Sequence, residues 1–144
     1  MLATILRQAI PRIPELTRFT FPSPHTNVKR TSVDFTVRNF QVKTVSSSEE
    51  FRQVLALRRA VFHQEFAGKR FSLRSDKDQY DDWADHLAIF DRKANKVAGV
   101  YRLINSDSEG PFYSASEYDI STLLGLPGRK LELSRACISK ESVS

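Results

Sequence analysis

An acidic stretch between Asp76 and Leu87 holds the residues best suited to chemistry. Five carboxylates fall within ten of its residues, and Tyr80, Trp83 and His86 lie among them. Three arginines elsewhere in the chain each sit inside an apolar pattern: Arg58, Arg102 and Arg135. Because a buried charge without a partner is very costly, we expect these arginines to meet carboxylates or phosphates. Together the acids and arginines predict a polar site built on an apolar scaffold.

Most other catalytic motifs have no counterpart in the sequence. The three histidines are scattered without the spacing of metal ligands, and neither a Gly-rich phosphate loop nor a nucleophile elbow is present, although the composition is compatible with a Ser/His/Asp triad. Cys137, the one cysteine, excludes an internal disulfide and lies in an apolar run that indicates a small buried side chain. We therefore expect no bound metal or cofactor. The remaining acids and arginines, with Glu132, suit proton removal from an amine and recognition of an ionic substrate.

The net positive charge of the chain lies in its N-terminal part. The whole chain has 22 Lys and Arg against 17 Asp and Glu, a net charge of +5. Residues 1–43 contain seven basic and two acidic residues, which is 7 − 2 = +5, and residues 44–144 contain fifteen of each. A nucleic-acid-binding domain needs a basic face on its folded part, so this neutral balance argues against nucleic acid as a partner.

Residues 1–37 are predicted to be a basic, flexible extension, and residues 38–144 to be a folded domain. Four prolines interrupt any helix longer than the first ten residues: Pro11, Pro14, Pro22 and Pro24. The basic start favours a disordered extension, a mitochondrial address in a eukaryote, or contact with an anionic membrane surface. No run of 18 apolar residues exists, so we expect a cytoplasmic protein, with peripheral contact at the inner membrane as the alternative.

A helix is predicted to begin after Ser47, which starts a capping box with Glu50. The residues with the spacing of one helical face are Phe51, Val54, Leu55, Phe62 and Phe66. Arg58 lies in the middle of that face, where it either belongs to a binding site or forms a structural ion pair. Gly68 is expected to end the helix.

Four strands are predicted, over residues 40–45, 86–90, 97–104 and 131–138. The second and third should form an antiparallel hairpin. In the third, alternation places Ala98, Val100, Arg102 and Ile104 on one face. In the fourth, Glu132 and Arg135 point to opposite faces unless a bulge brings them together. A short helix over residues 119–124 lies before the last strand.

Six short motifs occur in one order: Arg58–Phe62, Asp76–Asp81, Asp85–Leu87, Gly99–Leu103, Phe112–Asp119 and Leu131–Arg135. In this order they resemble the ornithine N-acyltransferase and hemolysin-like branch of the GNAT acyltransferases, over roughly residues 40–138. They are similar, more distantly, to the acyl-homoserine-lactone synthases, although the motif Phe112–Asp119 favours the ornithine branch.

The resemblance implies an α/β (α+β) fold: a GNAT-like mixed, mostly antiparallel sheet flanked by helices. It implies transfer of a long (3-hydroxy)acyl chain from an acyl-carrier-protein thioester, or from acyl-CoA, to the α-amine of ornithine or a similar amine. By this resemblance Arg58 and Phe62 shape the acceptor site, and Glu132 and Arg135 are the catalytic candidates, with Glu132 as the base. The residues that would form an ionic network around the acceptor are Asp76, Asp78, Asp81 and Arg102.

Two features depart from the family pattern. The family usually has Gly at the position of Ser134. We expect the side chain of Ser134 to crowd a bulge there. The chain also stops at Ser144, where the family continues with a pyrophosphate-binding loop, a helix and further strands. We therefore expect the N-terminal part of a longer enzyme, a truncated product, or a piece that needs a partner.

Three functional readings follow from these observations. The first is the N-acyltransferase, with an acyl carrier protein and a small amine as partners. An acyl-homoserine-lactone synthase-like enzyme is a further alternative to it. The second is an inactive fragment or binding module that keeps the acceptor pocket or the carrier-protein surface. The third is a nucleic-acid binder that uses the basic extension of residues 1–37. Its affinity for nucleic acid would fall steeply with salt concentration.

Overall fold

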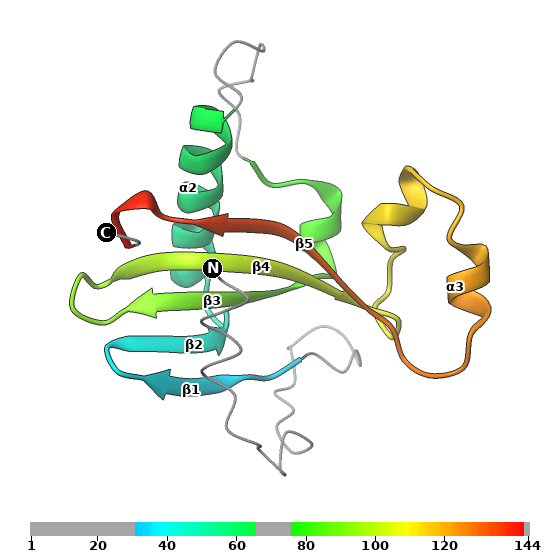
Figure 1. Cartoon of the computed structure of the whole chain (residues 1–144), viewed down its shortest axis with the longest axis horizontal. Helices are drawn as coiled ribbons and strands as arrows, with labels where there is room; N and C mark the ends of the chain where they lie inside the picture. Colours follow the sequence, from blue (N-terminus) through cyan, green and yellow to red (C-terminus); the bar gives the residue numbers. More distant parts are fainter. Residues whose placement is uncertain (1–30, 66–75, 143–144) are drawn as a thin grey trace.

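The computed structural model describes residues 31–65 and 76–142. These residues form a five-stranded antiparallel sheet whose strands follow one another in chain order (Figure 1). The strands are β1 (Asp34–Val37), β2 (Phe40–Thr44), β3 (Asp85–Asp91), β4 (Lys96–Asn105) and β5 (Leu131–Ile138). The four predicted strands and the β3–β4 hairpin are confirmed, and the sheet with its helices is consistent with the expected GNAT-like fold.

Strand β1 is an addition to the prediction, because residues 34–37 were assigned to the N-terminal extension. It pairs with β2 through a tight turn at Arg38 and Asn39, since Val37 lies opposite Phe40. Arg38 has a positive φ of 55°. Such turns are usually marked by Gly, Asn or Asp at the left-handed position, and an arginine there gives no turn signal. The prolines of the extension lie outside the described residues.

Helix α2 (Ser48–Glu65) packs against β4 and β5 on one face of the sheet (Figure 1). Its N-cap is confirmed, because the Glu50 backbone N–H donates to Ser47 Oγ at 3.2 Å. In a capping box the Glu50 carboxylate would accept from the N–H of the N-cap residue, Ser47. Here it accepts instead from the Ser46 N–H at 2.9 Å. The predicted helix end at Gly68 lies outside the described residues.

An apolar cluster fills the space between α2 and the sheet. Its buried members are Val54, Ala88, Val97, Val100 and Cys137. The interpretation of Cys137 as a small buried side chain is therefore confirmed. Since this packing fixes α2 over β4, it also fixes the polar residues that share the same faces.

Ala98 does not share the face of Val100 and Arg102, and that prediction is wrong. Ala98 packs on the opposite face of the sheet with Val42 and Ile89. The cause is a register shift between β3 and β4, where Ile89 pairs with Gly99 but Phe90 pairs with Val97. One extra residue in β4 reverses the alternation upstream of it.

A second bulge interrupts the pairing of β4 with β5. Val100 pairs with Cys137 and Arg102 with Ser134, so one residue of β4 faces two residues of β5. One of those two, Arg135, has a positive φ of 51°. This is the bulge considered in the sequence analysis, and it turns both Ser134 and Arg135 toward the face that α2 covers, as their contacts below show.

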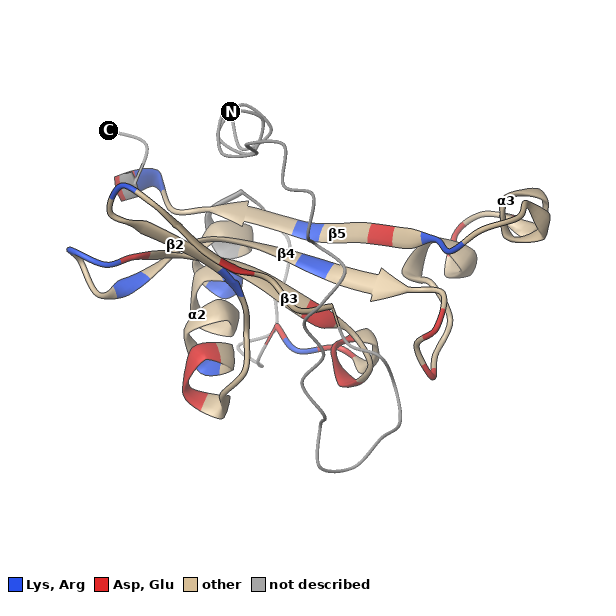
Figure 2. Cartoon of the chain, turned by 90° about the horizontal axis from the view of Figure 1, so that it is seen from below, with Lys and Arg blue, Asp and Glu red and all other residues tan. Residues whose placement is uncertain are grey.

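The remaining elements are short. They are η1 (Gln79–Asp82), η2 (Tyr113–Ser116), α3 (Ser121–Gly125) and η3 (Lys140–Ser142). Helix α3 corresponds to the short helix expected at residues 119–124 and lies away from the sheet, beyond the ends of β4 and β5 (Figure 1). Basic and acidic residues are interspersed over the elements seen in Figure 2. Within the described ranges, no helix is long and apolar enough to cross a membrane.

Candidate functional site

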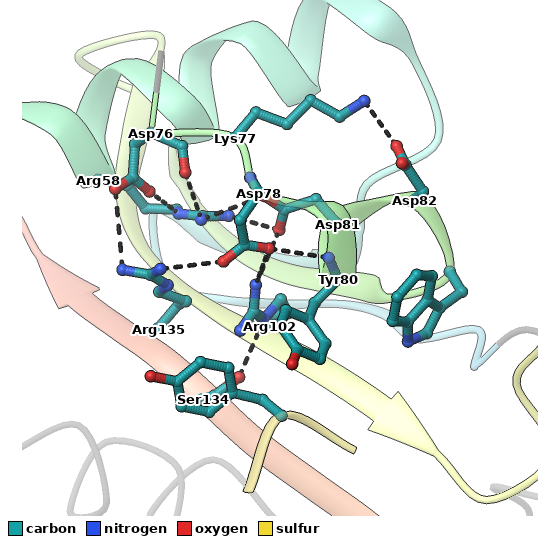
Figure 3. A network of polar contacts seen from close by, with 12 residues as sticks. Arg58, Asp76, Lys77, Asp78, Tyr80, Asp81, Asp82, Arg102, Ser134 and Arg135 are labelled. Carbon is teal, nitrogen blue, oxygen red and sulfur yellow. Dashed lines mark hydrogen bonds and ion pairs between the residues drawn. The ribbon is translucent and has the colours of Figure 1, made fainter. Parts of the chain in front are cut away.

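Arg58 is the centre of a buried ionic network between α2, η1 and the sheet (Figure 3). Its side chain is 0% exposed. Its Nη1 and Nη2 donate to the two carboxylate oxygens of Asp81 at 2.8 and 3.2 Å, and its Nε donates to Asp76 Oδ2 at 2.5 Å. A further bond joins Nη2 to the Asp76 backbone carbonyl at 3.1 Å. Every guanidinium nitrogen of Arg58 is thus paired.

Asp81 is placed by η1, which begins with a capping box between Asp78 and Asp81. Its carboxylate accepts bonds from the Asp78 N–H at 2.9 Å and pairs with His86 Nε2 at 3.0 Å, besides the bonds from Arg58. Burial alone would raise the pKa of Asp81, but the hydrogen bonds from His86 and Arg58 outweigh it and hold that pKa well below its usual range. Asp81 is therefore ionised at neutral pH.

Arg102 enters the same network from β4 and is also 0% exposed. Its Nη1 donates to Asp78 Oδ1 at 2.6 Å and lies 3.4 Å from Asp81 Oδ1. Its Nε donates to Ser134 Oγ at 3.0 Å. The guanidinium lies 5.4 Å from the ring centre of Tyr80 and 5.5 Å from that of Tyr113, distances at which cation–π attraction operates.

Asp78 and Arg135 form the part of the network nearest to solvent, with side chains 25% and 28% exposed. Arg135 Nη2 donates to Asp78 Oδ2 at 2.9 Å, and its Nη1 lies 3.8 Å from Asp76 Oδ1. The guanidinium lies 5.4 Å from the ring centre of Phe62 on α2. Burial alone would raise the pKa of Asp78. Hydrogen bonds from Arg102 and Arg135 lower this pKa by more than burial raises it, so the net shift is downward.

Glu132 lies on the sheet face of Arg102 but has different partners. One of its carboxylate oxygens accepts from the Tyr113 N–H at 3.1 Å, and the other accepts from Ser114 N–H and Oγ at 2.9 and 2.5 Å. Glu132 therefore anchors η2 to β5. Its hydrogen bonds with described residues do not include Arg135, so the bulge places the two on one face without a direct bond.

Of the predicted site residues, the structure brings together three arginines, three aspartates and the ring of Phe62. Residues 57–142, which include most of this network, match the acetyltransferase (GNAT) domain family. The chain belongs to the GNAT family.

Three relatives of this GNAT chain are named L-ornithine N(alpha)-acyltransferase. The protein of Rhodobacter capsulatus is 31% identical over 112 residues, which are 69% of this chain and 43% of that protein. Those of Brucella abortus and Rhizobium meliloti are 29% and 33% identical, over 73% of this chain and 42% and 40% of their own lengths. The chain thus spans about two fifths of the length of these relatives. No solved structure matches it significantly.

Sequence reasoning missed four members of the GNAT site: Tyr80, His86, Tyr113 and Ser134. His86 pairs with Arg102 across the β3–β4 hairpin and so shares its face, but this register follows from the shift between Ile89 and Phe90, which simple strand alternation did not predict. The Ser134 hydroxyl, expected only to crowd the bulge, accepts the bond from Arg102 Nε. The rings of Tyr80 and Tyr113 come from two separate loops, and their convergence on Arg102 has no local sequence signal.

The acids of the network already have cationic partners. Three arginines face three aspartates, so the charges of these side chains balance within the network. Within the described residues, no group of three His, Cys, Asp or Glu side chains is arranged to hold a metal ion. The arrangement instead suits binding of a small molecule that carries both charges.

Proposed function

We propose that this GNAT domain binds the amine acceptor of an N-acyltransferase that moves a long acyl chain from an acyl-carrier-protein thioester to the α-amine of ornithine. The observation that carries the proposal is the buried network of three arginines and three aspartates, which reaches solvent at Asp78 and Arg135. The names of the relatives support ornithine as the acceptor.

The charges of ornithine complement this network. At neutral pH the free amino acid carries two ammonium groups and one carboxylate. A site lined with arginines and aspartates offers partners for both signs, which favours such a zwitterion over an apolar amine. Asp78 and Arg135 present one charge of each sign at the solvent-facing part of the site.

In the proposed reaction, the α-ammonium first loses a proton to a base, either directly or through water. Glu132 is the candidate for this role. The free amine then attacks the thioester carbonyl and a C–N bond forms. As the C–S bond breaks, the nitrogen loses a second proton and the departing thiolate takes up a proton, so that the carrier leaves as its free thiol. Backbone N–H groups freed by the β5 bulge at Arg135 are candidates for stabilising the negative oxygen of the intermediate.

A second candidate function is an acceptor-binding domain without turnover. The position of Glu132 favours it, because both carboxylate oxygens are already bonded to η2. A catalytic Glu132 has to accept a proton beside these bonds, whereas a binding domain uses Glu132 only to hold η2 in place.

The test is release of thiol from a long-chain acyl carrier protein, with and without ornithine, and in parallel from acyl-CoA. Ornithine-dependent release that disappears in Glu132→Gln supports the transferase, and Glu109→Gln, which alters an exposed glutamate outside the network, is the matched control. Absence of release, together with measurable ornithine binding, contradicts the transferase and leaves the binding domain. Faster release from acyl-CoA contradicts the carrier-protein donor.

A further inference from the structure

One buried nitrogen of Arg102 has no hydrogen-bond partner among the described residues, whereas all three guanidinium nitrogens of Arg58 are paired. Among the buried side-chain nitrogens and oxygens that the structure describes, Arg102 Nη2 is the one atom without a hydrogen-bond partner. A buried charged donor without an acceptor is destabilising, so such atoms in folded proteins call for an explanation. A ligand atom or an ordered water supplies such an acceptor.

The direction of this nitrogen is fixed by its neighbours. Ser134 Oγ holds Nε, and Asp78 Oδ1 holds Nη1. The rings of Tyr80 and Tyr113 lie against the guanidinium and limit its movement. Because the guanidinium is planar, fixing two of its nitrogens also fixes the third. Nη2 is thus a preorganised donor that points at one position.

The charge balance of the network limits what can occupy that position. The best acceptor for a guanidinium N–H is a carboxylate, because the bond is charge-assisted. A simple anion would also lie near the carboxylates of Asp78 and Asp81, which repel it. An amino acid avoids this repulsion, because its ammonium groups can face those aspartates while its carboxylate faces Arg102.

We infer that Arg102 Nη2 donates to the α-carboxylate of the amino-acid acceptor, and that Ser134 is a positioning residue that holds Arg102 for this contact. The inference rests on the proposed function and adds the group that distinguishes an amino acid from a plain diamine. Ser134 occupies a position that the resemblance assigns to Gly, so the hydroxyl is a feature of this chain.

Access to Nη2 requires a neighbour to move, because Arg102 is fully buried. Tyr80 is itself buried, whereas Tyr113 is half-buried and belongs to the short η2 outside the sheet. Tyr113 is therefore the side chain expected to shift when the acceptor binds. Its shift would leave the bonds of Ser134 and Asp78 to Arg102 in place.

The test compares ornithine with ornithinamide, in which a neutral amide replaces the carboxylate, by calorimetric titration of the purified protein. The wild type should bind ornithine about tenfold or more tightly than ornithinamide, because ornithinamide cannot form the charge-assisted contact with Arg102. Arg102→Lys should reduce this preference to about threefold or less, because lysine lacks the planar fork. Ser134→Ala keeps the charge of Arg102 and should also weaken the preference, with ornithinamide binding unchanged.

Two further variants separate positioning from general damage. Ser134→Thr keeps a hydroxyl and should retain the preference. Ser108→Ala removes a hydroxyl that donates to the Gly110 carbonyl, outside the ionic network, and should not change it. The side-chain NMR signals of Arg102 should shift on addition of ornithine and not of ornithinamide.

The outcomes separate this inference from the proposed function. Equal affinity of the wild type for the two compounds, or an unchanged preference in both Arg102→Lys and Ser134→Ala, overturns the inference even if ornithine is acylated. Failure to bind either compound overturns the acceptor site altogether. A preference that depends on Arg102 without any acyl transfer supports the inference in a binding domain.

Discussion

Arg58 and Asp81 form a two-point ion pair that joins α2 to η1, with nitrogen–oxygen distances of 2.8 and 3.2 Å and both side chains 0% exposed. Planar pairs of this kind are the strongest that arginine makes. Removing only one partner is costly, because the other charge is then buried without a partner. The loop that carries the acids is therefore attached to the helix by a contact that excludes water.

The first prediction concerns this pair. Arg58→Gln leaves Asp81 and Asp76 buried without their main partner, and we expect the free energy of unfolding to fall by about 3–5 kcal/mol. Urea unfolding followed by circular dichroism measures it. Arg59→Gln, at an exposed position on the next residue of the helix, is the control and should change stability by no more than about 0.5 kcal/mol. Equal effects of the two substitutions would contradict the role of Arg58.

The second prediction concerns acid. The pKa values of Asp78 and Asp81 are lowered in the folded state, so their ionised forms stabilise it above the pKa that aspartate has in the unfolded chain, about 3.9. This stabilisation is lost as the pH falls through the lowered values. We expect the free energy of unfolding to be nearly constant from about pH 7 to 5 and to fall steeply below about pH 4.

Urea unfolding at a series of pH values measures this slope, and Asp81→Asn should flatten it because the substituted residue no longer titrates. Asp82→Asn removes an exposed carboxylate that pairs with Lys77, and it should retain the slope of the wild type. A slope that is the same in Asp81→Asn and in the wild type would show that other groups cause the acid sensitivity.

The third prediction concerns Gly110. A Cβ atom on Gly110 would overlap the indole ring of Trp83, which forces the indole to move. We expect Gly110→Ala to destabilise the protein by about 1–3 kcal/mol and to change the fluorescence of Trp83, the only tryptophan. Gly125→Ala is the matched control, because no atom lies within 4 Å of its added Cβ. Unchanged fluorescence in Gly110→Ala would contradict the close packing.

The fourth prediction concerns Arg135 and its left-handed backbone. Gly removes a conformational cost of about 1–2 kcal/mol there, while the partly exposed ion pair with Asp78 is worth only about 0.2–1 kcal/mol. Arg135→Gly should therefore be as stable as the wild type or slightly more stable, yet bind ornithine more weakly. Thermal unfolding and calorimetric titration measure the two effects.

Arg38→Gly supplies the control for that pair of measurements. Arg38 has a similar φ of 55° but lies in the β1–β2 turn, outside the ionic network. Its substitution should also stabilise the protein and should leave ornithine binding unchanged. If both variants bind ornithine as well as the wild type does, Arg135 has no part in acceptor binding.

Helical periodicity was sufficient to place Arg58, because its position within an apolar face fixes its direction once the helix packs. The same holds for Arg102 on β4, which alternates with Val100 and Ile104. Single-residue bulges limited the prediction elsewhere. Ala98 faces the other side of the sheet because of one extra residue beside Gly99. A glycine inside a strand is itself a bulge signal, and the prediction from simple alternation did not use it.

The partners of Glu132 and Ser134 were also out of reach of the sequence. Both depend on loops whose side chains arrive from far along the chain, such as Tyr113, whose backbone N–H binds Glu132. Likewise, β1 was missed because Arg38 occupies a turn position that glycine or asparagine would have marked. Regular elements are therefore predictable here, and the contacts between irregular segments are not.

The ionic network also has a consequence for the order of folding. Its pairs join residues that are 23, 24 and 57 positions apart: Arg58 with Asp81, Arg102 with Asp78, and Arg135 with Asp78. Contacts between such distant residues form only after the intervening chain has been closed into a loop, which is slow compared with local hairpin formation. The pair that needs β5 in place closes the longest loop, so the ionic network is completed last, and a chain still emerging from the ribosome lacks the Arg135–Asp78 pair until that strand has joined the sheet.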